Sequence, residues 1–332
     1  MHLAWAAAAI DPAARVARTT SLHDGASPWL LEVRRGDQTD KFVLRVADCD
    51  RVWAPAIATA AAGLQIATQH NLPTARLIAL DLDGTITGAP SLLETYCPGV
   101  STPPPDPKAL FSAGVGLAAL HTIPLAATPD LPVRWHHTPP DDHPGDRRWT
   151  HRYQQAPESE RRSVLAEFVE QHPWMSPDRA LDRLRNTPVT ALLLEAEQRI
   201  GHHHRPPDDV PVFLHADMWF GNTLWSDNHC LGLIDWKSAG VGHPGIDLGS
   251  LRLNAALIYG MSAAAEITRG WEETIGRKAD AVAHWDAVAA LYTPADVGAL
   301  PAPAGREISS VEASRRRDAF LLDALDRLDN NR

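Results

Sequence analysis

The feature that most constrains this chain is residues 212–249, where polar residues follow short apolar runs at fixed spacing. The first run delivers His215 and Asp217 into a loop, and Asn222 follows five positions after Asp217. A second apolar run ends at Asp235. Short β-prone runs that end in polar residues predict strand ends that bring those side chains to one place.

These residue types fit the transfer of a phosphoryl group. That group carries negative charge, which hard metal ions neutralise, and such ions prefer oxygen ligands. Asn222 offers an amide oxygen and Asp235 a carboxylate, while Asp217 can accept the hydrogen bond of a substrate hydroxyl. The spacing matches the protein-kinase catalytic loop H-R-D-x-x-x-x-N, with Ala216 in place of the arginine. Because Ala216 removes the residue that responds to activation-loop phosphorylation, a constitutively active small-molecule kinase is favoured.

Four pieces in this order resemble the signature of the aminoglycoside phosphotransferase family, which includes choline-kinase-like relatives: His215-x-Asp217, Asn222, Asp235-Trp236 and Asp247-Leu248. The resemblance implies that Asp217 is the catalytic base. It also implies that Asn222 and Asp235 bind Mg²⁺ and that Asp247 braces the catalytic loop. His215 by itself is expected to be a buried structural residue.

The resemblance extends from about residue 20 to the C-terminal helices. It implies a protein-kinase-like α+β fold, with an N-lobe at 1–97 and a C-lobe at 98–332. The N-lobe would hold an antiparallel sheet and one main helix, and the C-lobe would be mostly helical. Leu92 to Gly99 is similar to the family's adenine-binding hinge. ATP, or GTP in its place, would then lie against the backbone of Glu94, Thr95, Tyr96 and Cys97.

Local patterns predict the elements of this fold. In the first hundred residues they predict a short N-terminal helix at 1–10 and a hairpin of strands at 29–33 and 41–46. They also predict a longer helix at 52–70 and a second strand pair at 76–82 and 90–96. The proline-rich stretch from Pro98 to Pro107 predicts a lobe boundary. Beyond it, the patterns predict helices at 108–121 and 158–172, one that begins at Pro177, one at 188–200 and several after 235. Residues 126–155 read as a long irregular insertion.

The phosphate-binding side of the site departs from the kinase pattern. Arg45 stands where kinases place the strand lysine that holds the α- and β-phosphates, and a guanidinium can bind phosphate bidentately. The usual helix glutamate is missing, because no acidic residue occurs between Val52 and Leu80 and Ala60 aligns best with that position. Either Arg45 functions without a helix carboxylate or another acid replaces it. A non-catalytic, pseudokinase-like nucleotide-binding protein is therefore an alternative.

The nucleotide loop is represented by residues 22–28, which contain a single glycine. Backbone N–H groups near Gly25 and Ser27 could contact phosphate, as in other anion-binding turns. A surface turn explains the same residues equally well.

Two further motifs suggest other chemistries. Asp81 and Asp83, after an apolar run, resemble the nucleophile motif of haloacid-dehalogenase-type phosphatases, but a strand–turn–strand with Asp83-Gly84 at its tip explains them without catalysis. The run His202–His204 could bind a metal, although a solvated turn is the simpler interpretation.

Composition limits the partners. The formal net charge of the 332 residues is −10, with 41 acidic and 31 basic residues, which argues against nucleic acid or an anionic membrane as partner. The charge suits a cationic substrate, although acidity for solubility alone is equally plausible. Three separated cysteines and no basic start to a signal sequence suggest the cytoplasm. An aminoglycoside or another antibiotic is the implied acceptor, and choline, a sugar or an amino alcohol is the alternative. The oligomeric state is not indicated.

Overall fold

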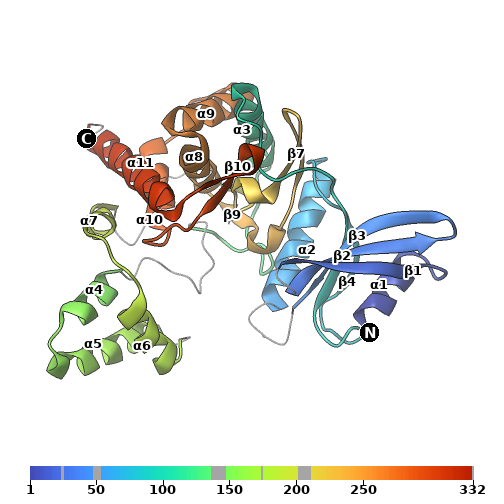
Figure 1. Ribbon diagram of the computed structural model, residues 1–332, viewed down its shortest axis with the longest axis horizontal. Coiled ribbons are helices and arrows are strands. Elements are labelled where there is room, and N and C mark those ends of the chain that lie inside the picture. Colours follow the sequence, from blue (N-terminus) through green and yellow to red (C-terminus); the bar gives the residue numbers. More distant parts are fainter. Residues whose placement is uncertain (24–25, 48–53, 136–146, 173–174, 201–210, 331–332) are drawn as a thin grey trace.

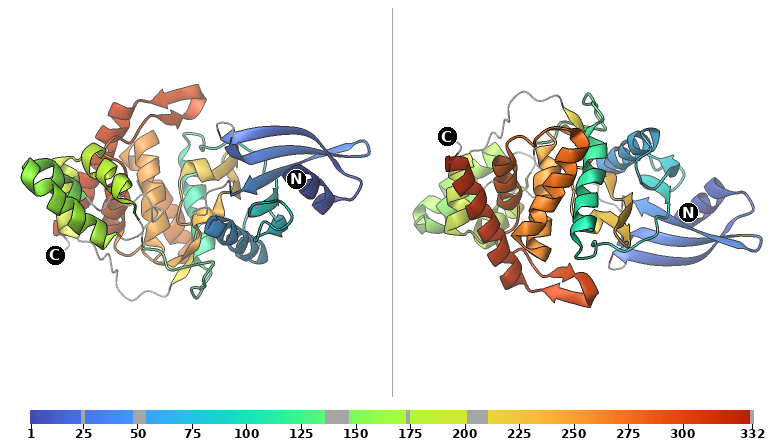
Figure 2. Two further views of the ribbon diagram at one scale, coloured as in Figure 1. Left: turned by 90° about the horizontal axis from the view of Figure 1, so that it is seen from below. Right: turned by 90° about the horizontal axis from the view of Figure 1, so that it is seen from above.

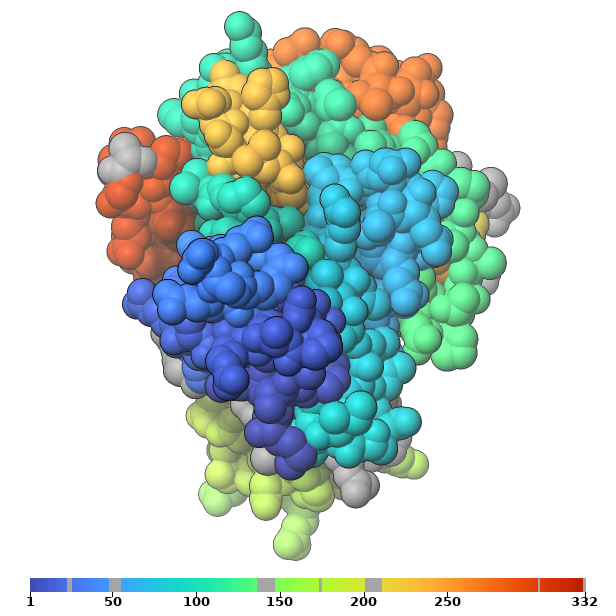
Figure 3. Space-filling view, turned by 90° about the vertical axis from the view of Figure 1, so that its right-hand side faces the viewer, coloured from blue at the N-terminus to red at the C-terminus, as the bar shows by residue number. Residues whose placement is uncertain are grey.

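The computed structural model describes residues 1–23, 26–47, 54–135, 147–172, 175–200 and 211–330. A sheet with its two helices stands at one end of the elongated molecule, and helices make up most of the rest (Figure 1). Figure 3 looks along the molecule from the sheet end, so that α1 and the sheet strands (dark blue) lie in front of the helical part.

The N-terminal part is built on one antiparallel sheet with the strand order β1–β2–β3–β5–β4. Its strands are β1 (Arg15–His23), β2 (Ala26–Arg35), β3 (Gln38–Val46), β4 (Leu77–Asp81) and β5 (Ser91–Thr95). The predicted hairpin is confirmed as the β2–β3 connection, where Gly36 takes the left-handed φ of +57° that a tight turn requires. The second predicted strand pair is confirmed as β4 and β5.

Two helices cover opposite faces of this sheet, namely α1 (His2–Ile10) and α2 (Ala54–Gln69). Leu93 of β5 packs in the core cluster that contains α1, whereas its neighbour Leu92 packs in the cluster that contains α2. Successive residues of a strand point to opposite faces. Arg45 and Glu94, which alternate with residues of the α1 face, therefore lie on the face that carries α2.

The C-terminal part is mostly helical, as predicted. Its long helices are α3 (Pro107–His121), α8 (Gly245–Tyr259), α9 (Met261–Ile275), α10 (Val282–Leu291) and α11 (Ser310–Asn330). Three short strand pairs accompany them: β6 (Val212–Leu214) with β9 (Gly240–Gly242), β7 (Thr223–Ser226) with β8 (His229–Leu233), and β10 (Leu300–Ala302) with β11 (Arg306–Ile308). Short turns of 3-10 helix lie at Phe220–Asn222, Trp236–Ser238 and Pro303–Gly305.

Helices α3 and α9 lie side by side and approach each other closely (Figure 2). Glycines make this approach possible, since a Cβ atom on Gly114 would come within 2.0 Å of the carbonyl oxygen of Ile267. A Cβ atom on Gly270 would come within 2.1 Å of the carbonyl oxygen of Phe111. The two backbones are therefore in contact, and any larger residue at either position would separate the helices.

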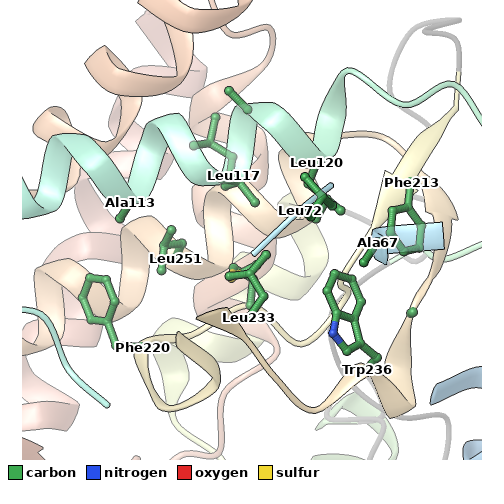
Figure 4. Packing of buried hydrophobic residues seen from close by; sticks show 14 of the residues in the cluster. Ala67, Leu72, Ala113, Leu117, Leu120, Phe213, Phe220, Leu233, Trp236 and Leu251 are labelled. Atoms are coloured by element: carbon green, nitrogen blue, oxygen red, sulfur yellow. The ribbon is translucent and has the colours of Figure 1, made fainter. Parts of the chain in front are cut away.

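The main hydrophobic core continues from α2 into the helical part. Trp236, just after β8, lies beside Leu233 and Phe213 in this core, and Leu117 and Leu251 come from α3 and α8 (Figure 4). The core thus joins the sheet end to the helices through the segment that carries Asp235. The predicted division into lobes at residue 97 stays a prediction.

A group of short helices forms a separate lobe-like projection, seen at the lower left of Figure 1. These helices are α4 (Arg147–Gln155), α5 (Glu158–Gln171) and α6 (Pro177–Asn186), and α7 (Ala191–Ile200) follows them. The prediction that 126–155 is irregular throughout was wrong at α4. Although this segment is polar, its Trp149 and Tyr153 are four residues apart and pack together with Phe168 of α5 in a small core. The predicted helix start at Pro177 is confirmed for α6, and the hydroxyl of Ser176 caps it by accepting a hydrogen bond from the backbone N–H of Arg179 at 3.3 Å.

Among the described residues, none of the helices combines the length and the apolar character that crossing a membrane requires.

Candidate active site

After the end of β6, His215, Ala216 and Asp217 begin a loop whose backbone is held by Asp247. Asp247, at the start of α8, is fully buried and accepts hydrogen bonds from the backbone N–H of His215 at 2.8 Å and of Ala216 at 2.7 Å. Ala216 has a left-handed φ of +59°, which turns the chain sharply before Asp217. The carboxylate of Asp247 therefore fixes a strained turn whose N–H groups would otherwise be buried without partners.

Asp247 is held in turn from α3 and α9. Trp271 donates its indole N–H to His121 Nδ1 at 2.9 Å, so the imidazole hydrogen lies on Nε2, which is 3.4 Å from Asp247 Oδ2. These residues come from α9, α3 and α8. A chain of hydrogen bonds from Trp271 through His121 to Asp247 therefore connects the packed helices with the loop.

The loop is also tied to the strand that ends at Asp235. His215 Nε2 donates to the carbonyl oxygen of Ile234 at 2.8 Å, and the Ile234 N–H donates to the carbonyl oxygen of Asn222 at 3.0 Å. The side-chain amide of Asn222 donates to the carbonyl oxygen of Asp217 at 2.7 Å. Asp235 itself takes a left-handed φ of +68°. The three polar residues predicted from the sequence thus lie in one hydrogen-bonded unit.

Arg45 reaches this unit from β3. Its Nε donates to Glu94 Oε1 and its Nη1 donates to Asp235 Oδ1, each at 2.8 Å. Lys237 continues the line of charges, because its ammonium contacts Asp235 Oδ2 and lies 3.4 Å from Asp217 Oδ2. A continuous alternation of negative and positive groups therefore runs from the sheet to the loop at the end of β6.

Comparison with known proteins identifies the family of the chain. A family model described as the phosphotransferase enzyme family, APH, matches residues 19–291. The chain belongs to the APH phosphotransferase family. A search of curated proteins found no similar sequence.

Solved structures of low sequence identity share the fold. A protein of Ralstonia eutropha, described as a proposed aminoglycoside phosphotransferase, is 13% identical, with 93% of this chain and 92% of that chain covered and a TM-score of 0.53. Macrolide 2'-phosphotransferase MphH of Brachybacterium faecium is 16% identical, with 86% and 88% covered and a TM-score of 0.52. A thermostable mutant of aminoglycoside phosphotransferase APH(4)-Ia, in a ternary complex with AMP-PNP and hygromycin B, is 12% identical, with 94% of each chain covered and a TM-score of 0.52.

In this APH-family chain, the carboxylate that accompanies Arg45 comes from an unexpected element. Of the two alternatives that the sequence left open, the structure shows the second, since Glu94 of β5 replaces the missing helix acid. Glu94 was expected to contribute backbone to the adenine-binding hinge, but its buried side chain pairs with Arg45. Arg45 lies opposite Leu92 in the sheet, and Glu94 is two residues further on the same face, so a long side chain spans the diagonal. Ala60 is buried in the main core instead.

Burial and neighbouring charge shift the pKa values of the site. Burial raises the pKa of the Asp217 carboxyl, and the nearby charges of Lys237 and His215 only partly offset this. Burial would likewise raise the pKa of Asp235, but Arg45 and Lys237 outweigh it and hold that pKa below its ordinary value. Burial would lower the pKa of the Lys237 ammonium, but the two carboxylates raise it. The pKa values of the two aspartates are thus pushed apart, as in many acid–base sites.

The remaining predicted nucleotide contacts lie around Arg45 and at the end of β5. Ser27 accepts a hydrogen bond from the backbone N–H of Val46 at 2.9 Å, and Gly25 lies outside the described residues. The backbone N–H of Thr95 donates to the carbonyl oxygen of Arg76 at 2.9 Å, and that of Tyr96 donates to the carbonyl oxygen of Lys41 at 3.3 Å. Cys97 follows, and burial raises the pKa of its thiol.

Two tryptophans near the site have different environments. Trp236 is buried and stacks on Phe213 with ring centroids 5.4 Å apart. Trp219 is 39% exposed, and its indole lies over Gly221, where a Cβ atom would come within 2.2 Å of the ring. Trp219 is therefore the tryptophan of the loop that a ligand could reach.

The alternative chemistries find no support in the described residues. Asp81 is buried and accepts hydrogen bonds from the backbone N–H groups of Ile86 at 3.0 Å and Thr87 at 2.8 Å, so it braces a turn. Its partner in the phosphatase motif, Asp83, is exposed. The run His202–His204 lies outside the described residues.

Sequence reasoning missed Lys237. The available signal was a lysine two positions after the predicted metal ligand Asp235, in a chain with few lysines. Nothing in a linear pattern indicates that its ammonium returns to both Asp235 and Asp217.

Proposed function

We propose that this APH-family phosphotransferase transfers the γ-phosphoryl group of ATP, or of GTP, to a hydroxyl group of a small molecule, with magnesium as cofactor. The observation that carries the proposal is the connected line of charges from Glu94 through Arg45, Asp235 and Lys237 to Asp217. It joins the proposed base Asp217 and the proposed metal ligand Asp235 to Arg45, which lies 190 residues from Asp235 in the chain.

Asp217 is the proposed base. The hydroxyl of the acceptor would donate its hydrogen bond to the Asp217 carboxylate, and its oxygen would form the new bond to the γ-phosphorus as the bond to the β-phosphate oxygen breaks. The hydroxyl proton passes to Asp217, and the nucleoside diphosphate leaves with the bonding electrons. Because burial raises the pKa of Asp217, its carboxylate is a stronger base than an exposed one.

Arg45 is the proposed phosphate ligand of the nucleotide. A guanidinium has five N–H groups, and the bonds to Glu94 and Asp235 use two of them. Within the described residues the other three make no further hydrogen bond, so phosphate oxygens can accept from them. Glu94 and Asp235 keep the planar group oriented, so that little side-chain entropy is lost when phosphate binds.

The residues present fit a magnesium ion. Since the Nδ2 of Asn222 is used in the bond to Asp217, its Oδ1 is the atom left for a cation, and Asp235 adds a carboxylate. The ammonium of Lys237 already stands at this carboxylate as a positive group. Mg²⁺ is commonly bound by one or two protein ligands together with substrate phosphates, which is the number of ligands offered here. When bound, magnesium would neutralise charge on the transferring phosphoryl group.

The acceptor we propose is an aminoglycoside or another antibiotic, and the alternative is a choline-, sugar- or amino-alcohol-type metabolite. Support for an antibiotic comes from the names of the structures that share the fold, two of which are macrolide and aminoglycoside phosphotransferases. The net charge of −10 suits a cationic acceptor.

The test is ADP release from ATP and magnesium across aminoglycosides, macrolides, amino alcohols and sugars. Wild type and Asp217→Asn are compared, because the amide keeps the shape of the carboxylate but cannot act as the base. Release that depends on the acceptor and falls about 10²- to 10⁴-fold in the variant would support the kinase and name its acceptor class. Nucleotide binding by thermal shift without release for any acceptor would favour the pseudokinase alternative. Loss of both would refute the proposed function.

A further inference from the structure

The ammonium of Lys237 lies between two carboxylates that the proposed function treats separately. It is 3.4 Å from Asp217 Oδ2 and contacts Asp235 Oδ2. The side chains of Lys237, Asp217 and Asp235 are only 29%, 28% and 21% exposed, so solvent screens these charges incompletely.

The position of this lysine is fixed by its neighbours in the chain. Lys237 lies in the 3-10 turn that follows Asp235, and Trp236 between them is buried in the main core. The left-handed backbone of Asp235 turns the chain back at this point. The backbone of Lys237 is therefore fixed by its neighbours, and its side chain points back so that the ammonium contacts the carboxylate of Asp235.

Without a cation between them, the two carboxylates would repel each other. Asp235 has a second positive partner in Arg45, which takes its Oδ1. For Asp217, Lys237 is the one Lys or Arg partner among the ion pairs of the described residues. Removal of the lysine therefore leaves the proposed base with a like charge nearby and no paired cation.

A divalent ion and the ammonium need the same atom. Asp235 is the proposed metal ligand, and its Oδ1 is used by Arg45, so the oxygen that remains is the Oδ2 that Lys237 occupies. An ion that binds there either displaces the ammonium or shares the oxygen with it at the cost of repulsion between two cations.

We propose that Lys237 is a built-in counter-ion of this site. Its ammonium holds Asp217 and Asp235 together in the metal-free protein and leaves Asp235 when a divalent ion binds there. Lys237 therefore weakens metal binding while it keeps the site assembled before nucleotide arrives. After the exchange its ammonium stays on Asp217 and positions that carboxylate. The inference rests on the metal-ligand assignment of the proposed function.

The experiment measures the affinity for Mn²⁺, added alone to the full chain, by electron paramagnetic resonance of the free ion. Lys237→Met removes the charge, and Lys237→Arg keeps it. The matched control is Lys278→Met, which removes a lysine that is paired with Glu272 on the surface and is 88% exposed. We expect Lys237→Met to bind Mn²⁺ about tenfold more tightly than wild type, and the other two variants to stay close to wild type.

A second readout is thermal stability with and without the ion. The metal-free Lys237→Met protein should melt below Lys278→Met, and saturating Mn²⁺ should close this gap, because the ion then supplies the missing positive charge. If Lys237→Met does not fold, Lys237→Gln serves in both measurements.

Equal Mn²⁺ affinity in wild type and in the charge-removing variants, including no detectable binding to any of them, would overturn the role of Lys237 alone. Binding that is unchanged in Asp235→Asn would refute the metal site itself and, with it, the metal-dependent part of the proposed function. Acceptor-dependent ADP release is measured separately, so the two failures can be told apart.

Discussion

The two halves of the candidate site are held together in different ways. In the helical part, the loop after β6 is held mainly by hydrogen bonds within residues 212–249, and its brace Asp247 is held in turn from α3 and α9. In the sheet part, Arg45 is fixed by partners that are 49 and 190 residues away in the chain. The helical half depends on residues that are close together in the chain. The sheet half depends on the register of the strands and on the contact between Arg45 of β3 and Asp235.

The difference shows what the partly buried guanidinium of Arg45 requires. It needs a carboxylate at the right place and charge, but the element that supplies this carboxylate is free to change. Helix α2 cannot supply it at Ala60, because this face of the helix packs in the main core with Leu64 and Trp236. A glutamate there would be buried among apolar side chains, and Glu94 on β5 meets the same need from the sheet.

The largest effect in this comparison is expected for Asp247→Ala, which tests the helical half. The substitution leaves two buried backbone N–H groups, those of His215 and Ala216, without their acceptor. Each such loss costs about 1–3 kcal/mol, so we expect the free energy of unfolding to fall by roughly 2–6 kcal/mol. Urea unfolding measures it, with Asp326→Ala on the exposed side of α11 as the control. Unchanged stability would mean that the loop is held in another way.

The next effect concerns the sheet half. Glu94→Gln keeps the size of the side chain but removes the negative charge that pairs with the buried Arg45. Breaking a buried pair from one side is costly, and we expect a loss of about 2–4 kcal/mol in the free energy of unfolding. Nucleotide affinity, measured by thermal shift with AMP-PNP, should fall as the guanidinium loses its orientation.

The control for Glu94 is Glu32→Gln on β2, a partly exposed glutamate in the same sheet. Glu32→Gln should change neither the free energy of unfolding nor the affinity for AMP-PNP. If Glu94→Gln binds nucleotide as wild type does, the pair with Asp235 alone is enough to orient Arg45, and the two halves are less dependent on each other than the structure suggests.

The same contrast explains what could be predicted from the sequence. The strand pairs, several helices and the place of Asp217, Asn222 and Asp235 in one loop system follow from apolar runs and spacing, because backbone hydrogen bonds within a short segment decide them. The two-lobed fold was implied by the family resemblance of these motifs. The pairing of Glu94 with Arg45 and the return of Lys237 to Asp217 could not be predicted. They depend on which face of β5 meets β3 and on one left-handed residue at Asp235, neither of which leaves a periodic signal.

A smaller effect should come from Gly221→Ala, which tests how tightly the loop is packed on its exposed side. A Cβ atom would come within 2.2 Å of the Trp219 ring, so the indole must move away. We expect about 1–3 kcal/mol of destabilisation from this overpacking, measured by urea unfolding. The double variant Gly221→Ala, Trp219→Ala should recover most of the loss, because the clash is then absent. If it recovers none, the backbone at Gly221, rather than the contact with Trp219, is what matters.

The smallest effect is expected where an ion pair is both local and exposed. Glu312, in the first turn of α11, accepts hydrogen bonds from Arg315 and Arg316, and these bonds lower its pKa from the ordinary 4.5 to about 2. A carboxyl whose pKa is lower in the folded state stabilises the fold above pH about 4.5, and this contribution is lost as the pH falls towards about 2. Glu312→Gln should therefore lower the Tm at pH 7 only slightly, and the difference from wild type should vanish near pH 2. Melting curves across this range measure it. If Glu312→Gln lowered stability as much as Glu94→Gln, the number of hydrogen bonds would matter more than burial. We expect the opposite, namely that burial and distance in the chain set how much a charged pair stabilises this protein.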